Sequence, residues 1–487
     1  MGETKPLKEK TITGFKWVII ENTLDLGIVF LISVILSRIL TPADYGLVGM
    51  TVIFALILKV FVDGGLRSSL IRYRIVTQKD FTTVFYFKFV ISIVCYLLLF
   101  FCAPLIAIFY KQPVLTNIVR LSSLSLIINT LSTIHHTICT KEINFKTPTI
   151  IGIVSNISGG GVGIALAYNG FGVWSLVWQA LIKSSVSTSL FWFAIKWRPR
   201  WYFSKRLFFR HFRFGMNILK SNLIMHIVDN FNTLVIGKYY SPALLGQFSR
   251  AEAFVNLFSK GLFAVSHRIM YPVLCSINND QARLNAVFNK FMAIISFFTA
   301  YLTFMLVAVS DNFIPLIIGN QWGISIVYLK IIALGAFFYP IRTQNIYYAN
   351  VLGRSDLFAK AIAFQRTLTI VIAIIGAFTY IEVLVYGYTV SSICSYIYNT
   401  LQIKKVTGIH LGSQMKLILS CNWVTFILAI FIYLLGLTLH YDHSINFLIQ
   451  FFVAILLSFA AFETLKPKVY LEIKSILVAE SVKLFKR

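Results

Sequence analysis

The chain has 487 residues, of which 57% are apolar and only 13% are charged, and its mean hydropathy is +0.78. A soluble protein carries about 25% charged residues, so this composition excludes a soluble globular protein and indicates a polytopic membrane protein. The net charge of +26 comes from 44 basic and 18 acidic residues. In a membrane protein such an excess is typical of basic cytoplasmic loops, and we expect no nucleic-acid partner.

A helix that crosses the bilayer needs about 20 apolar residues. Hydropathy predicts 14 such segments, so we expect an all-α polytopic fold. The first segment follows a polar, basic start without a small-residue cleavage site, which predicts an uncleaved helix. The predicted spans are 15–37, 45–66, 82–106, 117–139, 148–168, 173–195, 215–237, 245–272, 288–310, 325–348, 360–380, 383–403, 417–439 and 444–464.

The distribution of lysine and arginine predicts the orientation. If the N-terminus is cytoplasmic, 31 of the 44 basic residues lie in cytoplasmic segments or at the cytoplasmic ends of spans, and 3 lie in outer loops. Because basic loops resist translocation, this ratio favours cytoplasmic N- and C-termini and an even number of helices.

The chain also contains an internal repeat. RILTPADYG at 38–46 and KYYSPALLG at 238–246 share a basic residue, Thr or Ser, Pro-Ala and Gly at an offset of 200 residues. Each follows a first apolar segment, and a basic linker separates the halves. Six helices precede the linker, so the repeats are parallel. We expect an N-lobe at 1–195, the linker at 196–214, a C-lobe at 215–403, and two further helices with a basic cytoplasmic tail at 404–487.

Charged residues inside spans are costly and mark candidate sites. Lys59, Asp63 and Arg67 recur at intervals of four in the second helix, which predicts one shared face. They line a water-filled lumen, or Lys59 and Asp63 neutralise each other as an ion pair. His136 in the fourth helix and Arg250 and Arg268 in the eighth are further candidates for a substrate-binding lumen or its inner mouth.

Two other polar stripes are candidates for ion coupling. Glu21 and Asp25 share one face of the first helix, where close carboxylates raise each other's proton affinity. Alternatively, Glu21 lies at the inner interface and Asp25 pairs with a lysine. His226, Asp229 and Asn230 in the seventh helix predict a Na⁺ or proton site, or a hydrogen-bonded seam between helices.

The spans hold more cations than anions, which favours an anionic substrate such as a phosphate or an acidic sugar. Motifs for ATP hydrolysis, metal sites or covalent catalysis were not found, so we expect neither an enzyme nor a resident cofactor beyond a coupling Na⁺ or H⁺. The glycines at 158–163 predict close helix packing or a hinge.

Four segments resemble the polysaccharide-transporter family of the multidrug/oligosaccharidyl-lipid/polysaccharide flippase superfamily, and most closely its teichuronic-acid and colanic-acid type exporters. They are LTPADYGLVGM (40–50), GFGVWSLVWQ (170–179), WRPRWYFS (197–204) and DNFNTLVIGKYYSPALLGQFSRAEAF (229–254). The resemblance runs from about 15 to 280. The positions that match the family's hairpin motifs are Arg38, Pro42, Asp44, Gly46, Pro242 and Gly246.

The resemblance implies a V-shaped transporter with two lobes. Its implied substrate is an undecaprenyl-pyrophosphate-linked oligosaccharide, moved across the bacterial cytoplasmic membrane for lipopolysaccharide, capsule or exopolysaccharide synthesis. Implied partners are membrane lipid and the polymerase and chain-length regulator of the pathway. The alternatives are a drug or metabolite antiporter of the same superfamily, or a membrane polysaccharide polymerase or glycosyltransferase. The short predicted outer loops argue against an enzyme.

Overall fold

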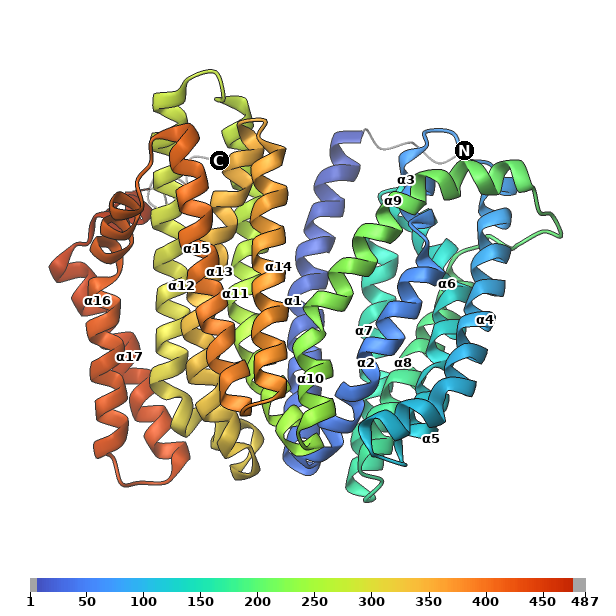
Figure 1. Ribbon diagram of the computed structural model, residues 1–487, viewed down its shortest axis with the longest axis horizontal. Coiled ribbons are helices and arrows are strands. Elements are labelled where there is room, and N and C mark those ends of the chain that lie inside the picture. Colours follow the sequence, from blue (N-terminus) through green and yellow to red (C-terminus); the bar gives the residue numbers. More distant parts are fainter. Residues whose placement is uncertain (1–6, 476–487) are drawn as a thin grey trace. The chain divides into compact units, whose positions relative to one another are not determined.

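A computed structural model describes residues 7–475. Within that range it describes all side chains except those of 7–16, 18–23, 258, 260 and 262–269. The described chain consists of helices. It forms two compact units, Met1–Gly246 and Gln247–Arg487. Figure 1 shows the helices in order along the chain.

Ten complete helices lie in the first unit, and the helix that begins at Pro242 leads into the second. They are α1 (Leu7–Ile39), α2 (Pro42–Asp63), α3 (Leu66–Arg72), α4 (Gln78–Tyr110), α5 (Leu115–Ser122), α6 (Leu124–Lys141), α7 (Lys146–Tyr168), α8 (Val173–Ala194), α9 (Lys205–Asp229) and α10 (Phe231–Tyr239).

The second unit contains most of α11 and six further α-helices. The helices are α11 (Pro242–Ser276), α12 (Gln281–Ile318), the 3₁₀ turn η1 (Asn320–Trp322), α13 (Gly323–Val351), α14 (Ser355–Ala377), α15 (Ile381–Thr407), α16 (Leu411–Thr438) and α17 (His443–Leu465). Its core lies where α12, α13, α15 and α16 meet, with the rings of Phe288 and Tyr348 stacked at 4.2 Å between centroids.

Each of the 14 predicted spans is one helix, or two consecutive helices, in the structure. Over the described residues, nine helical segments meet both the length and the hydropathy of a membrane span. The prediction of an all-α polytopic membrane protein is therefore confirmed. The basic linker is partly helical, because α9 already begins at Lys205.

The prediction that Lys59, Asp63 and Arg67 share one continuous helical face is wrong. Helix α2 ends at Asp63, and Gly64 and Gly65 follow with φ of 53° and 64°. Only glycine adopts two such left-handed conformations in succession without strain. The chain therefore turns, and Arg67 lies on the short helix α3.

The two repeated hairpins cross at their glycines. A β-carbon on Gly46 would lie 1.7 Å from the carbonyl oxygen of Pro242, and one on Gly246 would lie 1.8 Å from that of Pro42. The contact is reciprocal, because each glycine lies against the proline carbonyl of the other hairpin. Glycine at these two positions lets the first turns of α2 and α11 touch backbone to backbone.

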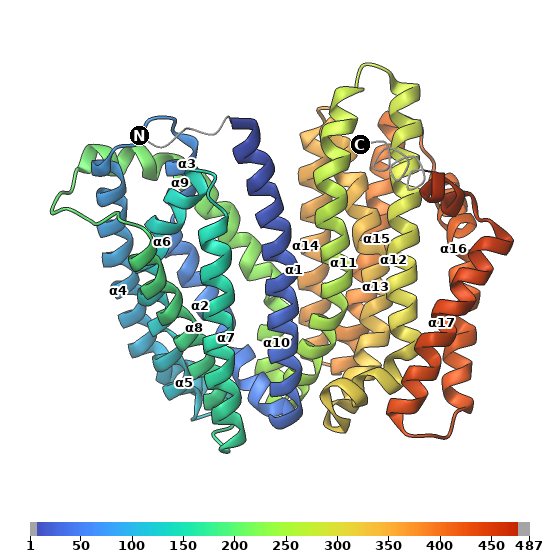
Figure 2. The same cartoon turned by 180° about the vertical axis from the view of Figure 1, so that it is seen from behind.

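The glycine-rich segment of α7 serves close packing, one of the two uses that its sequence predicted. A β-carbon on Gly160 would lie 2.2 Å from Ile32 of α1, and one on Gly159 would lie 2.7 Å from the Gln179 carbonyl oxygen of α8. Gly161, on another face of the helix, has no atom within 4 Å of its hypothetical β-carbon. Figure 2 shows α7 beside α1.

Buried amide side chains form hydrogen bonds that connect the last two helices, α16 and α17, with α12. Asn312 donates to Gln450 of α17 at 2.9 Å, and Gln450 donates to the carbonyl of Ile432 on α16 at 2.9 Å. Gly436 makes room for that amide, because a β-carbon there would lie 2.1 Å from its nitrogen. Helices α16 and α17 are therefore an integral part of the second unit.

The basic linker is docked on the first unit through Asp80, a side chain that is 3% exposed. Its carboxylate accepts from Thr77 as a capping box at the start of α4, and from Arg210 at 2.5 Å and His211 at 3.1 Å on α9. Burial lowers the pKa of His211, which lies before the predicted span. The neutral ring donates from Nε2 to Asp80 and accepts at Nδ1 from Ser69 at 2.8 Å.

Candidate functional site

The predicted lumen residues of the second helix meet a partner that the sequence analysis did not select. Asp63 accepts a hydrogen bond from Lys88 of α4 at 2.7 Å. The Lys88 side chain is 1% exposed, whereas that of Asp63 is 51% exposed. The predicted Lys59–Asp63 ion pair is thus replaced by a pair between helices. One carboxylate oxygen of Asp63 is engaged by a buried lysine, and the group as a whole stays accessible.

Arg67 and His136, both predicted as lumen residues, are in direct contact. Arg67 Nη2 donates to His136 Nδ1 at 3.0 Å and lies 3.4 Å from Thr140 Oγ1. Because arginine can only donate, His136 accepts at Nδ1, and its neutral ring carries the proton on Nε2. Both side chains are half-buried.

Lys59 is exposed and interacts electrostatically with Asp63, as does Arg67. We call Lys59, Asp63, Arg67, Lys88 and His136 the cationic cluster. It has three cations and one carboxylate, which leaves an excess of two positive charges. At membrane depth such an excess attracts an anion strongly, because water screens it poorly. Within the described part of the chain, groups of three or more potential metal ligands do not occur.

Of the first ion-coupling pair, only one member can be placed. Asp25 is half-buried and accepts a hydrogen bond from the Asn156 amide of α7, so its partner is an amide and not the lysine considered above. The side chain of Glu21 lies outside the described residues.

The second ion-coupling stripe lies at a break between helices. Helix α9 ends at Asp229 and α10 begins at Phe231. Between them, the Asn230 side chain donates to the carbonyl oxygen of His226 at 2.9 Å. The break places the Asp229 carboxylate beside the end of a helix, where a cation is favoured.

In the second unit, Arg250 is half-buried and its guanidinium lies 6.0 Å from the ring centroid of Trp322, a fully buried side chain. Arg268 lies on α11, but its side chain is outside the described residues.

The hairpin-motif residues have structural roles at the start of α2. Pro42 occupies the first helical turn, and Asp44 accepts from the Thr41 backbone at 2.9 Å, which completes a capping box. Gly46 and Gly246 form the crossing described above, and Pro42 and Pro242 supply its backbone oxygens. Arg38 lies in the last turn of α1. These positions specify the fold.

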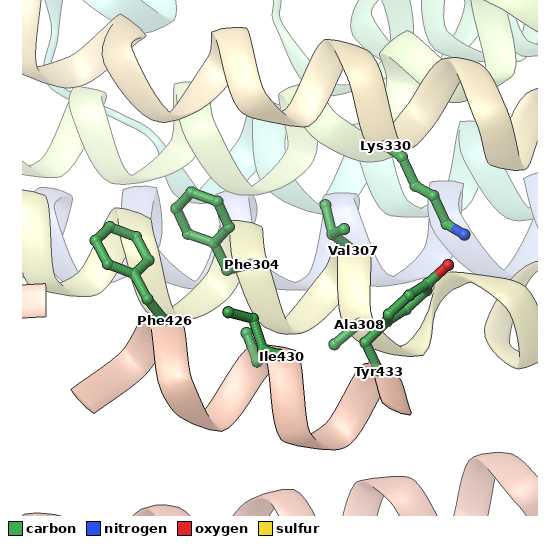
Figure 3. A pocket seen from close by; sticks show the side chains of 8 residues that line it. Phe304, Val307, Ala308, Lys330, Phe426, Ile430 and Tyr433 are labelled. Atoms are coloured by element: carbon green, nitrogen blue, oxygen red, sulfur yellow. The ribbon is translucent and has the colours of Figure 1, made fainter. Parts of the chain in front are cut away.

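A pocket of about 350 Å³ opens between α12, α13 and α16 in the second unit (Figure 3). Its walls are apolar. One end holds the Lys330 ammonium, which is bound to both Asp311 oxygens at 2.8 and 2.7 Å and lies 4.8 Å from the Tyr433 ring centroid. The charge at this end is therefore neutralised. The lining includes Phe304, Val307, Phe426, Ile430, Tyr433 and Lys330.

Sequence reasoning counted Lys88 only as one more cation within the spans and did not select Asp80, although both side chains are buried and paired in the first unit. Lys88 interrupts the apolar run FYFKFVIS, and a lysine at that depth needs an acidic partner nearby. Asp80 follows Thr77 at the spacing of a capping box, as Asp44 follows Thr41. Both signals are present in the sequence, but neither names the helix that supplies the partner.

The helical architecture, the paired hairpins and the cationic cluster together define a polytopic membrane protein of transporter type. A family model described as "Polysaccharide biosynthesis protein" matches residues 35–327, more than half of the chain. The chain therefore belongs to the polysaccharide biosynthesis protein family.

Three relatives are similar over most of their length. The lipopolysaccharide biosynthesis protein WzxC of Escherichia coli (strain K12) is 23% identical over 376 residues, 76% of each chain. The succinoglycan biosynthesis transport protein ExoT of Rhizobium meliloti (strain 1021) is 23% identical, over 77% of this chain and 76% of its own. The teichuronic acid biosynthesis protein TuaB of Bacillus subtilis (strain 168) is 24% identical, over 72% and 73%.

Two solved structures show the same fold. The lipid II flippase MurJ in an inward closed conformation aligns with a TM-score of 0.73 at 19% identity, over 97% of this chain and 100% of MurJ. An inward-facing multidrug resistance MATE family transporter aligns with a TM-score of 0.59 at 14% identity, over 80% and 99%. The fold is thus that of the superfamily to which the MATE transporter belongs.

Proposed function

We propose that the chain is a flippase that moves undecaprenyl-pyrophosphate-linked oligosaccharide repeat units across the bacterial cytoplasmic membrane for surface polysaccharide synthesis. Membership of the polysaccharide biosynthesis protein family is the observation that carries the proposal. The name of ExoT describes a transport protein and that of MurJ a lipid II flippase, which supports a lipid-linked substrate.

The cationic cluster supports the same assignment. A pyrophosphate carries the negative charge that an excess of two positive charges attracts, and Arg67 can bind phosphate oxygens through charge-assisted hydrogen bonds. The sugar head cannot enter hydrocarbon, so it crosses through the protein while the prenyl tail remains in lipid. Both termini are cytoplasmic in this proposal, and the loaded carrier enters from that side.

Transport then needs a driving gradient. We assign the coupling to Na⁺ or H⁺, with Asp25, His226, Asp229 and Asn230 as the groups that bind it, together with Glu21. The lobes at 1–195 and 215–403 alternate between inward-open and outward-open states. The polymerase and chain-length regulator of the pathway act on the product at the outer leaflet.

Deletion of the gene in its host tests the function. We expect loss of the surface polymer and accumulation of undecaprenyl-linked repeat units on the cytoplasmic side, both restored by the intact gene. In a host without a second flippase, intact polymer and unchanged lipid intermediates would refute the proposal and favour the antiporter alternative.

Arg67→Ala in the complemented strain tests the cationic cluster. Loss of one charge-assisted contact of about 1.5–3 kcal/mol predicts a drop of roughly 10- to 100-fold in export at normal expression. Arg268→Ala, at the predicted inner mouth, should also impair export. Lys183→Ala is the matched control, because Lys183 is exposed and outside the cluster, and it should be nearly silent. Equal effects of Arg67→Ala and Lys183→Ala would refute the role of the cluster.

A further inference from the structure

A buried arginine in the second unit lacks partners for part of its guanidinium. Arg342 lies on α13 and is 5% exposed. Its Nε and Nη1 atoms are buried, and among the residues whose side chains the structure describes they have no hydrogen-bond partner. An arginine cannot lose its charge in a protein, and a buried donor without a partner is strongly destabilising. The position therefore calls for a group that the described side chains around it do not supply.

The groups that interact with Arg342 include two tyrosines and a second arginine. The guanidinium lies 5.2 Å from the ring centroid of Tyr339, and it interacts electrostatically with Tyr388 and Arg366. Tyr388 in turn interacts with Glu252. No described carboxylate is therefore among the groups that interact with the Arg342 guanidinium, whereas a second cation, Arg366, is. A buried excess charge favours an anionic ligand.

The polar network beside Arg342 accepts no hydrogen bond from the Nε and Nη1 donors of its guanidinium. Asn399 of α15 donates to the Arg342 carbonyl at 3.3 Å, which engages the backbone and not the guanidinium. One turn further along α13, Asn345 donates to Thr400 at 2.9 Å and accepts from Gln414 at 3.1 Å. The Asn345 amide thus has its hydrogen-bond partners without Arg342. The unpaired N–H groups of Arg342 take no part in this network.

The facing helix offers a further unused donor. Tyr388, Ser395 and Asn399 recur on α15 at spacings of seven and four, so they lie on one face of the helix. That face is turned toward α13, because Asn399 bonds the Arg342 carbonyl. Ser395 is fully buried, and within the described part of the chain its hydroxyl has no hydrogen-bond partner. A phosphoryl group, which accepts several hydrogen bonds at once, matches these donors.

We propose that Arg342, with Tyr388 and Ser395 on the facing helix, forms an anion site in the second unit that takes a phosphoryl group. Resting on the proposed function, we assign this group to the pyrophosphate of the lipid carrier. Arg342 lies six residues before the predicted cytoplasmic end of its span, about 9 Å along the helix. The cationic cluster of the first unit and this site then each contribute one phosphate-binding position to the transport cycle.

The test uses the purified full-length protein in lipid nanodiscs and inorganic pyrophosphate in chloride-free buffer. Binding is followed by calorimetry and by the rise in thermal midpoint. We expect the intact protein to bind, Arg342→Gln to bind at least tenfold more weakly, and Arg342→Lys to lie between them, since lysine keeps the charge but loses the planar fork. Arg342→Leu should melt at a higher temperature than the intact protein without ligand, because a buried unpaired charge is gone.

Arg354→Gln is the matched control, because Arg354 is exposed just before α14, outside the helix that carries Arg342, and pairs with Asp356. It should bind pyrophosphate as the intact protein does. Unchanged binding by Arg342→Gln would overturn the proposal, and so would chloride that competes as well as pyrophosphate, since the site would then accept any small anion. Polymer retained in the deletion strain would refute the flippase function but not the anion site. The pyrophosphate binding of Arg342→Gln and Arg354→Gln would still test that site.

Discussion

Replacing Gly46 with alanine is expected to destabilise the protein by about 3 kcal/mol, the upper part of the range for overpacking. The new methyl group would lie 1.7 Å from the carbonyl oxygen of Pro242, and backbone cannot move aside as a flexible side chain can. Gly246→Ala should cost about as much, because its methyl group meets the Pro42 carbonyl oxygen at 1.8 Å. With total stabilities of about 5–15 kcal/mol, either change removes a large fraction of the protein's stability.

The measurement is the thermal midpoint of the purified variants, together with the monodisperse fraction after extraction. Gly161→Ala is the control, since nothing lies within 4 Å of its β-carbon and alanine favours a helix by about 1 kcal/mol. The double variant of Gly46 and Gly246 should cost less than the sum of the singles, because one displacement of the crossing relieves both clashes. A Gly46→Ala midpoint equal to that of Gly161→Ala would contradict the reciprocal crossing.

Asp80→Ala is expected to cost about 3 kcal/mol and to release the linker. Loss of the capping box accounts for about 1 kcal/mol. The fully buried His211, left without its acceptor, adds about 1–3 kcal/mol. Arg210 contributes less, because its side chain is 40% exposed and regains water. The variant should therefore show a lower thermal midpoint and faster trypsin cleavage within 196–213.

Asp356→Ala is the matched control for Asp80→Ala. Its carboxylate pairs with Arg354 at 2.8 Å, but both side chains are nearly half exposed, so solvent screens the pair and it adds little to stability. Cleavage of the linker should be unchanged in this variant. If Asp80→Ala left both the midpoint and the trypsin pattern unchanged, the docking of the linker would not depend on this carboxylate.

The places of the helical segments along the chain could be predicted, because bilayer thickness acts on each segment separately. Segment 245–272, which holds several charges, still forms one helix, α11, and the closely spaced pair 360–380 and 383–403 forms α14 and α15. The hairpin repeat was also visible, and the reciprocal contact between Gly46 and Gly246 gives its physical reason.

The partners of the charged residues could not be predicted, since partner choice depends on which helices are neighbours. Helical spacing suggested Lys59 for Asp63, but Gly64 and Gly65 end the helix there, and Lys88 approaches from α4. Similarly, the stripe through Asp229 assumed an unbroken helix, and the structure divides it at Asn230. Residues spaced four apart lie on one face only if the helix between them is unbroken.

The burial of each side chain distinguishes Arg342 from the other cations in the spans, whereas sequence spacing does not. In the sequence, Arg342 is one cation among several within the predicted spans. The structure distinguishes it, because its neighbours leave two buried nitrogens unpaired. By contrast, Lys330, another cation on the same helix, is neutralised by Asp311.

The central claim is that this chain alone moves the lipid-linked repeat unit between leaflets. The most direct measurement reconstitutes the purified protein in liposomes that contain the undecaprenyl-linked repeat unit extracted from the deletion strain. A membrane-impermeant glycosidase or lectin then reports the fraction of sugar exposed outside. If the protein is a flippase, nearly all of the sugar becomes accessible to the outside probe in vesicles that contain active protein. In protein-free vesicles only about half becomes accessible. Equal accessibility in both, with the protein correctly folded and an ion gradient imposed, would contradict this function.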